Sequence, residues 1–308
     1  MRYYTTRAAR WVALALRMLL GLFFVVSAVA KWVDLDRFEV YVFSLQLFSL
    51  HASFLLARLL IVCELLVGIG LLSNLCNRWV NGCTVLLLTG FSLLLGYVIL
   101  IGRTDSCQCM GAWLDISPTL SLLKNAVLLL LLVPASRCQP WPWRPRWYVW
   151  LPVTMAPFLM VFITSAPDNW MFPADNGHYD AAASAFVSEP ALRELHLDEE
   201  RHAVLFLTPG CRFCQLADQK VTAIRHRHQI DSTRIHYIVP AQLYRNYAAA
   251  TDAVAPYSMP VIALEDSTFR RITGGMRPLF MLIDAGKLQT VSHYRNIDER
   301  QIVVFFDK

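Results

Sequence analysis

Five long apolar stretches constrain the fold of this chain more than any other feature. A helix needs about 20 consecutive apolar residues to cross the hydrocarbon core of a bilayer. The stretches that approach or reach this length cover roughly residues 11–31, 52–73, 80–102, 117–134 and 148–166. The last one is the shortest and contains Pro152 and Pro157. The sequence therefore predicts an α-helical membrane bundle with a four-helix core and a shorter fifth span.

Charged residues are distributed unevenly along the chain. They make up 17% of the 308 residues, against about 25% in an average soluble domain, and they are scarce before about residue 166. The formal net charge of +5 does not indicate nucleic-acid binding, because the Lys and Arg residues are scattered in short loops that flank the apolar stretches. We expect two domains, the first surrounded by a lipid bilayer, and no nucleic-acid partner.

Basic residues in the loops predict the orientation of the bundle. Loops rich in Lys and Arg stay in the cytoplasm. The N-terminal tail, the second loop and the fourth loop carry such residues, namely Arg2, Arg7, Arg10, Arg78, Arg137, Arg144 and Arg146. With five spans, the N-terminus lies in the cytoplasm and the C-terminal domain in the periplasm of a bacterial inner membrane. Cleavage by signal peptidase after "AVA" at 28–30 is an alternative for the first span, and it would leave this orientation unchanged.

Two close cysteine pairs are the main chemical feature of the chain. Cys107 and Cys109 lie one residue apart between the third and fourth spans, and Cys211 and Cys214 lie two apart in the C-terminal domain. In the predicted topology both pairs face the periplasm and can meet. The other cysteines, for which we expect no redox role, lie within spans or face the cytoplasm: Cys63, Cys76, Cys83 and Cys138.

The segment around Cys211 predicts a strand, a turn and a helix. "HAVLFLT" has the length and apolar character of a buried strand, and the following Pro-Gly marks a break. After it Cys214, Ala217, Val221 and Ile224 recur at helical spacing. Cys211 therefore lies at a helix N-terminus, where unpaired backbone N–H groups and the helix dipole stabilise a thiolate. We expect Cys211 to be the nucleophile and Cys214 its resolving partner.

The rest of the C-terminal domain continues with a strand at "IHYIV", a helix over 241–252, "PVIAL", two strands joined by a turn at 284–287, and a closing helix from Ile297. This order resembles the α/β thioredoxin fold, and residues 278–287 resemble the P-x-F-x-x-I-D-x-x-G-K stretch of membrane-tethered thiol–disulfide oxidoreductases. The resemblance implies that Pro278 is a cis-proline opposite the CxxC, and that Pro278 and Arg277 bind substrate. Pro260 is the alternative cis-proline.

Two other interpretations of the CxxC motif remain open. Cys211 and Cys214 could form a static disulfide, or they could be half of a zinc site. Zinc normally takes four ligands, and His226 and His228 lie on the following helix, more than a turn beyond reach of Cys211. We favour redox activity and expect no metal.

The membrane segment also resembles known families. "LRMLLGLFFVVSAVAKWVD", "CELLVGIGLL", "CQCMGAW" and "LLKNAVLLL" occur in order along four spans, which is similar to DoxX-like membrane proteins and to the methylamine-utilisation protein MauE. The MauE resemblance implies a role in maturing a disulfide-rich periplasmic enzyme subunit. The fusion to a thioredoxin-like domain also resembles bacterial vitamin K epoxide reductase homologues. That resemblance implies quinone as a candidate electron acceptor, with no covalently bound cofactor.

The one-residue spacing of Cys107 and Cys109 favours a relay. A disulfide between them would close a small, strained ring, and strained disulfides are the labile ones. The alternatives are two unconnected reduced thiols or a Cu(I) site.

Glu64 lies in the middle of a predicted span. An ionisable residue there is expensive in lipid and is a functional candidate with a charged partner. Arg58 and Arg17 are the expected partners, and quinone binding or proton transfer is the expected role. Lys31 and Lys124, near outer span ends, either extend to the membrane interface or stabilise the thiolates of Cys107 and Cys109.

These features predict a membrane thiol–disulfide oxidoreductase that relays electrons between the two cysteine pairs and acts on periplasmic client proteins, with either direction of electron flow open. The alternative is a MauE-like maturation factor or chaperone for one periplasmic protein, or a protein that handles metal through its thiols. The expected domains are a four-span membrane domain over 1–135, a cytoplasmic loop and fifth span over 136–166, a linker over 167–199 and the thioredoxin-like domain over 200–308.

Overall fold

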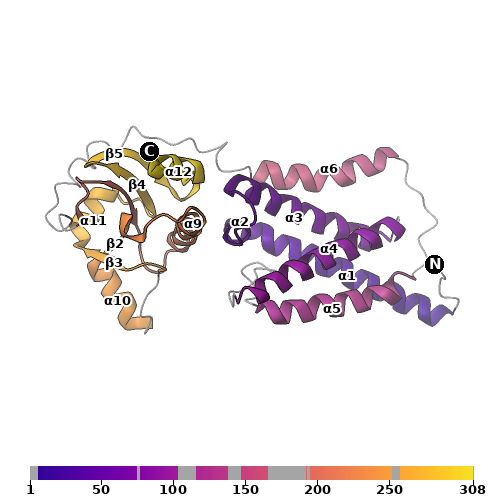
Figure 1. Ribbon diagram of the computed structural model, residues 1–308. Helices are drawn as coiled ribbons and strands as arrows, with labels where there is room; N and C mark the ends of the chain where they lie inside the picture. The colour runs from indigo at the N-terminus through magenta and orange to yellow at the C-terminus, as the bar shows by residue number, and fades with distance from the viewer. Residues whose placement is uncertain are drawn as a thin grey trace. The chain divides into compact units, whose positions relative to one another are not determined.

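The computed structural model describes residues 6–74, 77–102, 116–137, 147–165, 192, 195–251 and 257–307. The chain divides into two compact units, one made of residues 1–45 with 51–166 and the other of 46–50 with 167–308. The first unit is helical and the second is a mixed α/β domain (Figure 1). The predicted fold class, a helical membrane bundle followed by a thioredoxin-like domain, is confirmed.

The described residues of the helical part form α1 (Arg7–Val33), α2 (Leu35–Ser44), α3 (Leu50–Leu72), α4 (Asn77–Leu100), α5 (Pro118–Ala135) and α6 (Trp147–Thr164). Four of these, α1, α3, α4 and α5, are long and apolar enough to cross a membrane. They coincide with the first four predicted spans, so the chain is a multi-pass membrane protein. The fifth predicted span coincides with α6, whose apolar part Leu151–Thr164 is shorter, and its crossing of the membrane stays a prediction.

The helix α2 was not expected from the sequence, which suggested only a loop between the first two spans. Its ten residues carry Asp36, Arg37 and Glu39 among apolar ones, so the segment is too short and too charged to resemble a span. Apolar residues such as Phe38 and Val42 are nevertheless buried and join α1 and α3 in one core cluster. Burial of one face therefore stabilises this short helix, since ten residues alone do not form a stable helix in water.

Helices α1 and α3 approach each other closely at a pair of glycines. A Cβ atom added to Gly21 would lie 3.0 Å from the carbonyl oxygen of Gly68, and one added to Gly68 would lie 3.0 Å from the carbonyl oxygen of Gly21. Small residues at such crossings let membrane helices pack backbone against backbone. This contact fixes the register of α1 against α3, and with it the pairing of the charged side chains that the two helices carry.

The α/β domain is built on a five-stranded sheet in the order β3-β2-β1-β4-β5. The strands are β1 (Arg201–Phe206), β2 (Ile235–Pro240), β3 (Val261–Leu264), β4 (Leu279–Asp284) and β5 (Lys287–His293). β1 pairs in parallel with β2 and antiparallel with β4, so it lies at the centre of the sheet. Its residues from His202 onward are all buried, which explains the continuous apolar run in the sequence, because a central strand is covered on both faces.

Helices cover both faces of this sheet (Figure 1): α9 (Arg212–His228) and α12 (Glu299–Asp307) lie on one side, and α10 (Ala241–Thr251) and α11 (Asp266–Thr273) on the other. The predicted order of strands and helices is confirmed, except that α11 was missed. It is an eight-residue helix whose Phe269 and Ile272 enter the main core together with Val204 and Met281. The other six residues of α11 are polar, so the hydrophobic periodicity of the sequence did not predict this helix.

A buried pair of histidines predicts that the α/β domain loses stability in mild acid. His236 Nε2 lies 3.0 Å from His202 Nδ1. Burial, and secondly the charge of His202, lowers the pKa of His236 to about 4, against about 6.5 in an unfolded chain. The unfolded state therefore binds the proton first as the pH falls from about 6.5 to 4, and the free energy of unfolding falls through that window.

A pKa shift of this size in a fully buried group corresponds to roughly 3 kcal/mol of unfolding free energy. Because His236 is partly exposed, we expect the free energy of unfolding to fall by about 1–2 kcal/mol. Hydrogen exchange of β1 and β2 in the full-length protein in detergent, corrected for intrinsic exchange at each pH, would measure it. The variant His236→Gln should lose much of the pH dependence. An equal pH dependence in that variant would show that other groups cause it.

Candidate functional site

Cys211 caps the N-terminus of α9. Its backbone is extended (φ −84°, ψ 116°), and its Sγ accepts a hydrogen bond from the backbone N–H of Cys214 at 3.3 Å. The chain turns into this position through Gly210, whose positive φ of 73° suits glycine. Cys211 is half-buried, so its sulfur can be reached from solvent. The predicted position of Cys211, after a buried strand and at a helix N-terminus, is confirmed.

Cys214 lies one turn further into α9 and is completely buried. Its Sγ lies 3.4 Å from the backbone nitrogen of Thr208, which donates a hydrogen bond to it, and 3.5 Å from the Thr208 hydroxyl. Ala217, Val221 and Ile224, predicted to share a helix face with Cys214, are also buried. The packing of this face holds the second thiol beneath the first.

The two thiols differ in acidity. The hydrogen bond with the Cys214 thiol is the main cause that lowers the pKa of Cys211 to about 6, and the backbone N–H groups of Cys214 and Phe213 add to it. The same hydrogen bond, with burial, raises the pKa of Cys214 above its ordinary value. At neutral pH Cys211 is therefore mostly the thiolate, which is the nucleophilic form, while Cys214 keeps its proton.

This difference predicts the pH dependence of alkylation. The rate of reaction of Cys211 with iodoacetamide should rise with pH to a plateau with a midpoint at about pH 6, because only the thiolate reacts. Replacing Cys214 by Ala removes the main hydrogen-bond donor and should move the midpoint upward. Peptide-level mass spectrometry of the reduced protein would measure both. A wild-type midpoint near 8.5, the value of an unperturbed thiol, would contradict this electrostatic account.

Two polar residues behind the cysteines were not singled out from the sequence. Asp218, one turn beyond Cys214 on α9, accepts hydrogen bonds from the backbone N–H and the hydroxyl of Ser258. The neighbouring Tyr257 is buried, and its hydroxyl makes no hydrogen bond among the described residues. Burial, and then the adjacent Cys214 and Cys211, raises the pKa of Tyr257. No motif marks these residues, because Tyr257 and Ser258 meet α9 only when the segment before β3 folds against it.

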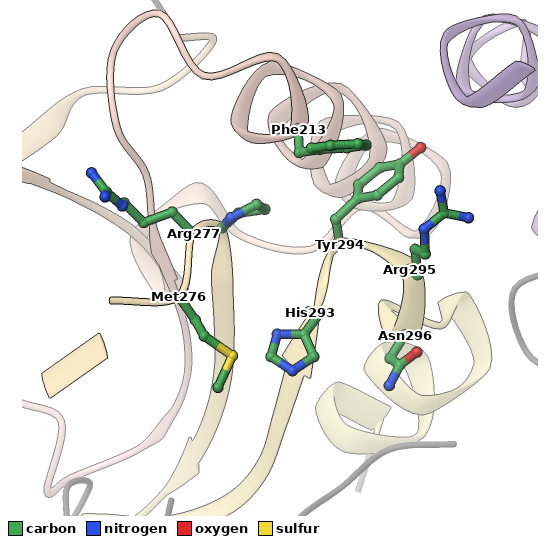
Figure 2. A pocket seen from close by; sticks show the side chains of 8 residues that line it. Phe213, Met276, Arg277, His293, Tyr294, Arg295 and Asn296 are labelled. Atoms are coloured by element: carbon green, nitrogen blue, oxygen red, sulfur yellow. The ribbon is translucent and has the colours of Figure 1, made fainter. Parts of the chain in front are cut away.

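The peptide bond between Arg277 and Pro278 is cis, as predicted, whereas the bond before Pro260 is not among the cis bonds. Pro278 directly precedes β4 and is buried, while Arg277 is exposed. Both line a groove with a volume of about 390 Å³, together with Phe213, which lies between the two cysteines in sequence. Figure 2 shows the rings of Phe213 and Tyr294 next to each other in this groove. The predicted substrate-binding residues thus share a groove with the CxxC loop.

The described residues contain no group of three or more His, Cys, Asp or Glu side chains that could hold a metal ion. Of the histidines considered for zinc, His228 lies 3.0 Å from a carboxylate oxygen of Glu299, and His226 lies 3.0 Å from the Arg225 guanidinium. Both are thus engaged elsewhere than at the cysteines. In this part of the chain the geometry does not support the zinc interpretation of Cys211 and Cys214.

Glu64 in the helical unit is paired with Lys31, not with Arg58 or Arg17 as expected. Lys31 Nζ lies 2.9 and 2.8 Å from the two carboxylate oxygens of Glu64 and 2.7 Å from the Ser27 hydroxyl. Lys31 is only 2% exposed, so the expectation that it extends to the membrane interface was wrong. The reason is the close packing of α1 on α3, which places Lys31 beside a carboxylate that can neutralise it within the bundle.

The two arginines proposed as partners of Glu64 have partners of their own. Arg58 forms a buried ion pair with Glu39 of the unpredicted helix α2. Arg17 donates a hydrogen bond of 2.7 Å to the side-chain oxygen of Asn81 on α4. Arg58 was expected to pair with Glu64 because it is close to it in the sequence of α3. In the structure Lys31 of α1 is the residue that lies beside Glu64.

Lys124 lines the same small cavity as Lys31 and Glu64, and its Nζ lies 5.5 Å from the centre of the Phe23 ring. The cavity has a volume of about 20 Å³, enough for about one water molecule. Pockets for organic ligands measure about 300–1,000 Å³. This cavity is smaller than such a pocket, and the quinone acceptor stays a prediction.

Four of the eight cysteines lie outside the described residues, among them the predicted relay pair Cys107 and Cys109. The others are Cys76 and Cys138. Cys63 on α3 and Cys83 on α4 are free cysteines on the outer surface of their helices. That position suits the expectation of small apolar residues facing lipid.

The helical unit carries the main match to a known family. Residues 9–136 match the family described as methylamine utilisation protein MauE. The N-terminal part of the chain is thus a MauE-like membrane domain, as its sequence suggested. About two thirds of the chain is similar to protein TlpB of Flavobacterium psychrophilum, with 23% identity over 69% of this chain and 72% of the relative. No solved structure matches the chain.

The comparison with TlpB extends beyond the MauE-like part. The MauE match ends at residue 136, and the 69% of the chain aligned with TlpB is larger than this segment. Similarity therefore includes residues outside the membrane domain.

Proposed function

We propose that this protein is a membrane thiol–disulfide oxidoreductase whose α/β domain exchanges disulfides with client proteins. The observation that carries this proposal is the arrangement of Cys211: an accessible sulfur at a helix N-terminus, with a pKa lowered to about 6, above a buried Cys214. A static disulfide needs neither an acidic thiol nor an adjacent groove. The groove that contains Phe213, Arg277 and Pro278 supplies a place for the client.

In the first step the thiolate of Cys211 attacks one sulfur of a client disulfide. A bond forms between Cys211 and that sulfur, and the other client sulfur leaves as a thiolate. The low pKa of Cys211 keeps the nucleophile ionised at neutral pH, and it also makes Cys211 a good leaving group in the reverse reaction. The backbone groups next to cis-Pro278 would bind the client backbone and hold it beside the CxxC.

In the second step Cys214 gives up its proton and attacks Cys211, which releases the second client thiol. The client has then gained two electrons and the Cys211–Cys214 pair has lost them. Because Cys214 is buried with a raised pKa, this step needs a base, and the departing client thiolate supplies one. The reverse sequence oxidises a client dithiol, so the same residues serve either direction.

Cys107 and Cys109 are the proposed partner of the CxxC in the membrane domain. Exchange between the pairs would transfer two electrons, with one pair becoming the disulfide as the other becomes the dithiol. The proposed topology places both pairs, and the client proteins, in the periplasm, with the bundle in the inner membrane and the N-terminus in the cytoplasm. Quinone stays a candidate final electron acceptor in this proposal, and no step through it is included.

The match to MauE supports a second candidate function, a maturation factor or chaperone dedicated to one disulfide-containing periplasmic protein. Such a factor would use the same cysteines but would recognise one client. The two candidates differ in how they treat an unrelated substrate.

Reactivation of scrambled ribonuclease and reduction of insulin by the purified full-length protein would separate the candidates. A general oxidoreductase is expected to accelerate either reaction over the uncatalysed rate, and to lose this effect when Cys211 is alkylated. A dedicated factor should act poorly on both while still forming a mixed disulfide with its own client. Copper or zinc in stoichiometric amount in the purified protein, with no exchange activity, would contradict both candidates.

A further inference from the structure

The groove beside the CxxC has an apolar floor. Four of its eight lining residues are apolar or aromatic, namely Phe213, Met276, Pro278 and Tyr294, and the ring centres of Phe213 and Tyr294 lie 5.6 Å apart. Phe213 is 39% exposed although it is a large apolar side chain. At about 390 Å³ the groove has room for one or two side chains of a client.

Tyr294 is held in place by Lys220 of α9. The Nζ of Lys220 donates a hydrogen bond to the Tyr294 carbonyl at 3.2 Å and lies 5.3 Å from the centre of its ring. Lys220 is completely buried. This contact holds Tyr294, which forms part of the groove wall.

The rim of the groove is also positively charged. Arg277 and Arg295 lie on opposite sides of it, as Figure 2 shows. The Arg212 guanidinium lies 5.7 Å from the Phe213 ring at the CxxC end. None of the eight residues that line the groove is acidic. Two of the eight are arginines, so the described lining carries more positive than negative charge.

We propose that this groove selects extended client segments with an apolar side chain next to the reactive cysteine and acidic side chains flanking it. The apolar side chain would lie against Phe213 and Tyr294, and the carboxylates would face Arg277 and Arg295. The inference rests on the proposed exchange function and adds to it a class of client. Opposite charge across an interface raises the association rate and rejects like-charged partners, so the main effect should be on binding.

Matched peptides activated as 2-pyridyl disulfides test this proposal. One peptide carries Glu on both sides of Phe-Cys and the other carries Lys at the same positions. In the full-length Cys214→Ser protein, the Cys211 thiolate attacks the peptide sulfur and expels 2-thiopyridone, whose absorbance reports the rate. The rate of the Cys211→Ser/Cys214→Ser double variant is subtracted, because it measures the reaction of the remaining cysteines.

The acidic peptide should react faster than the basic one, by roughly two- to fivefold for each arginine engaged, and the ratio should shrink as salt is added. Arg277→Glu should lower or invert the ratio. Lys287→Glu is the matched control, since it makes the same change of charge at the exposed first residue of β5, which pairs with the other end of β4. Taking the ratio of two peptides in each variant cancels any change in the intrinsic reactivity of Cys211.

An unchanged ratio in Arg277→Glu, or an equal change in Arg277→Glu and Lys287→Glu, would overturn the proposed selectivity and leave the exchange function standing. If neither peptide gave a Cys211-dependent reaction, the exchange function itself would fail. Replacing Phe in the acidic peptide by Ser should slow the reaction of the wild-type groove and have less effect in Phe213→Ala. Equal slowing in both proteins would contradict the apolar part of the proposal.

Discussion

Replacing Cys211 by Ser is expected to abolish disulfide exchange by this protein. The thiolate is the only form that attacks a disulfide, and loss of a nucleophile typically costs more than about 1,000-fold in rate. The completely buried Cys214 cannot substitute for it, because clients do not reach it and burial raises its pKa. Insulin reduction by the purified protein, with a thiol donor in excess, would measure the loss.

The matched control is Cys63→Ser, which removes a free cysteine from the outer surface of α3. It should leave the rate within about twofold of the wild type, since it touches neither the CxxC nor the groove. Exchange that persists in Cys211→Ser would mean that another cysteine is the nucleophile. Near-UV circular dichroism of both variants would show that the α/β domain is folded.

The second large effect is expected from the buried ion pair in the bundle. Replacing Lys31 by Met leaves the Glu64 carboxylate without its main partner, and removing one member of a buried pair costs about 3–5 kcal/mol. The free energy of unfolding of the protein in detergent, from titration with SDS, should fall by an amount of this order.

A double-mutant cycle separates the pair from its parts. Lys31→Met combined with Glu64→Leu should regain most of the stability, since an apolar pair of similar volume often replaces a buried ion pair without loss. Lys124→Met makes the same chemical change beside the same cavity and should cost much less, because Lys124 does not take part in the ion pair with Glu64. Additive effects of the Lys31 and Glu64 substitutions would contradict a direct coupling between the two charges.

The elements of this fold were largely predictable because each has a strong local signal. Hydropathy marks the four spans, and the alternation of apolar runs with breaks marks the strands. The pattern of Cys214, Ala217, Val221 and Ile224 gives the face of α9 that is buried. The short helices α2 and α11 lacked such a signal. Burial of a few apolar residues against distant helices or strands stabilises them, and that burial is a property of the tertiary structure.

The candidate site was predictable to the same extent. The CxxC at a helix N-terminus and the cis bond before Pro278 follow from the motif and from the family resemblance. The partner of Glu64 could not be predicted from the sequence. Lys31 is 33 residues away from Glu64 and reaches it only because of the register of α1 on α3. The groove wall at Tyr294 and the buried Tyr257 likewise depend on how the ends of strands meet in space.

The measurement that tests the central claim most directly uses Cys214→Ser, which leaves Cys211 able to attack but unable to be released. Cells that express the variant would be quenched with acid, free thiols blocked, and the partner of Cys211 identified by non-reducing peptide mapping. We predict disulfides from Cys211 to client proteins and to Cys107 or Cys109. A Cys211 that remains a free thiol, with no mixed disulfide to any protein, would contradict the account.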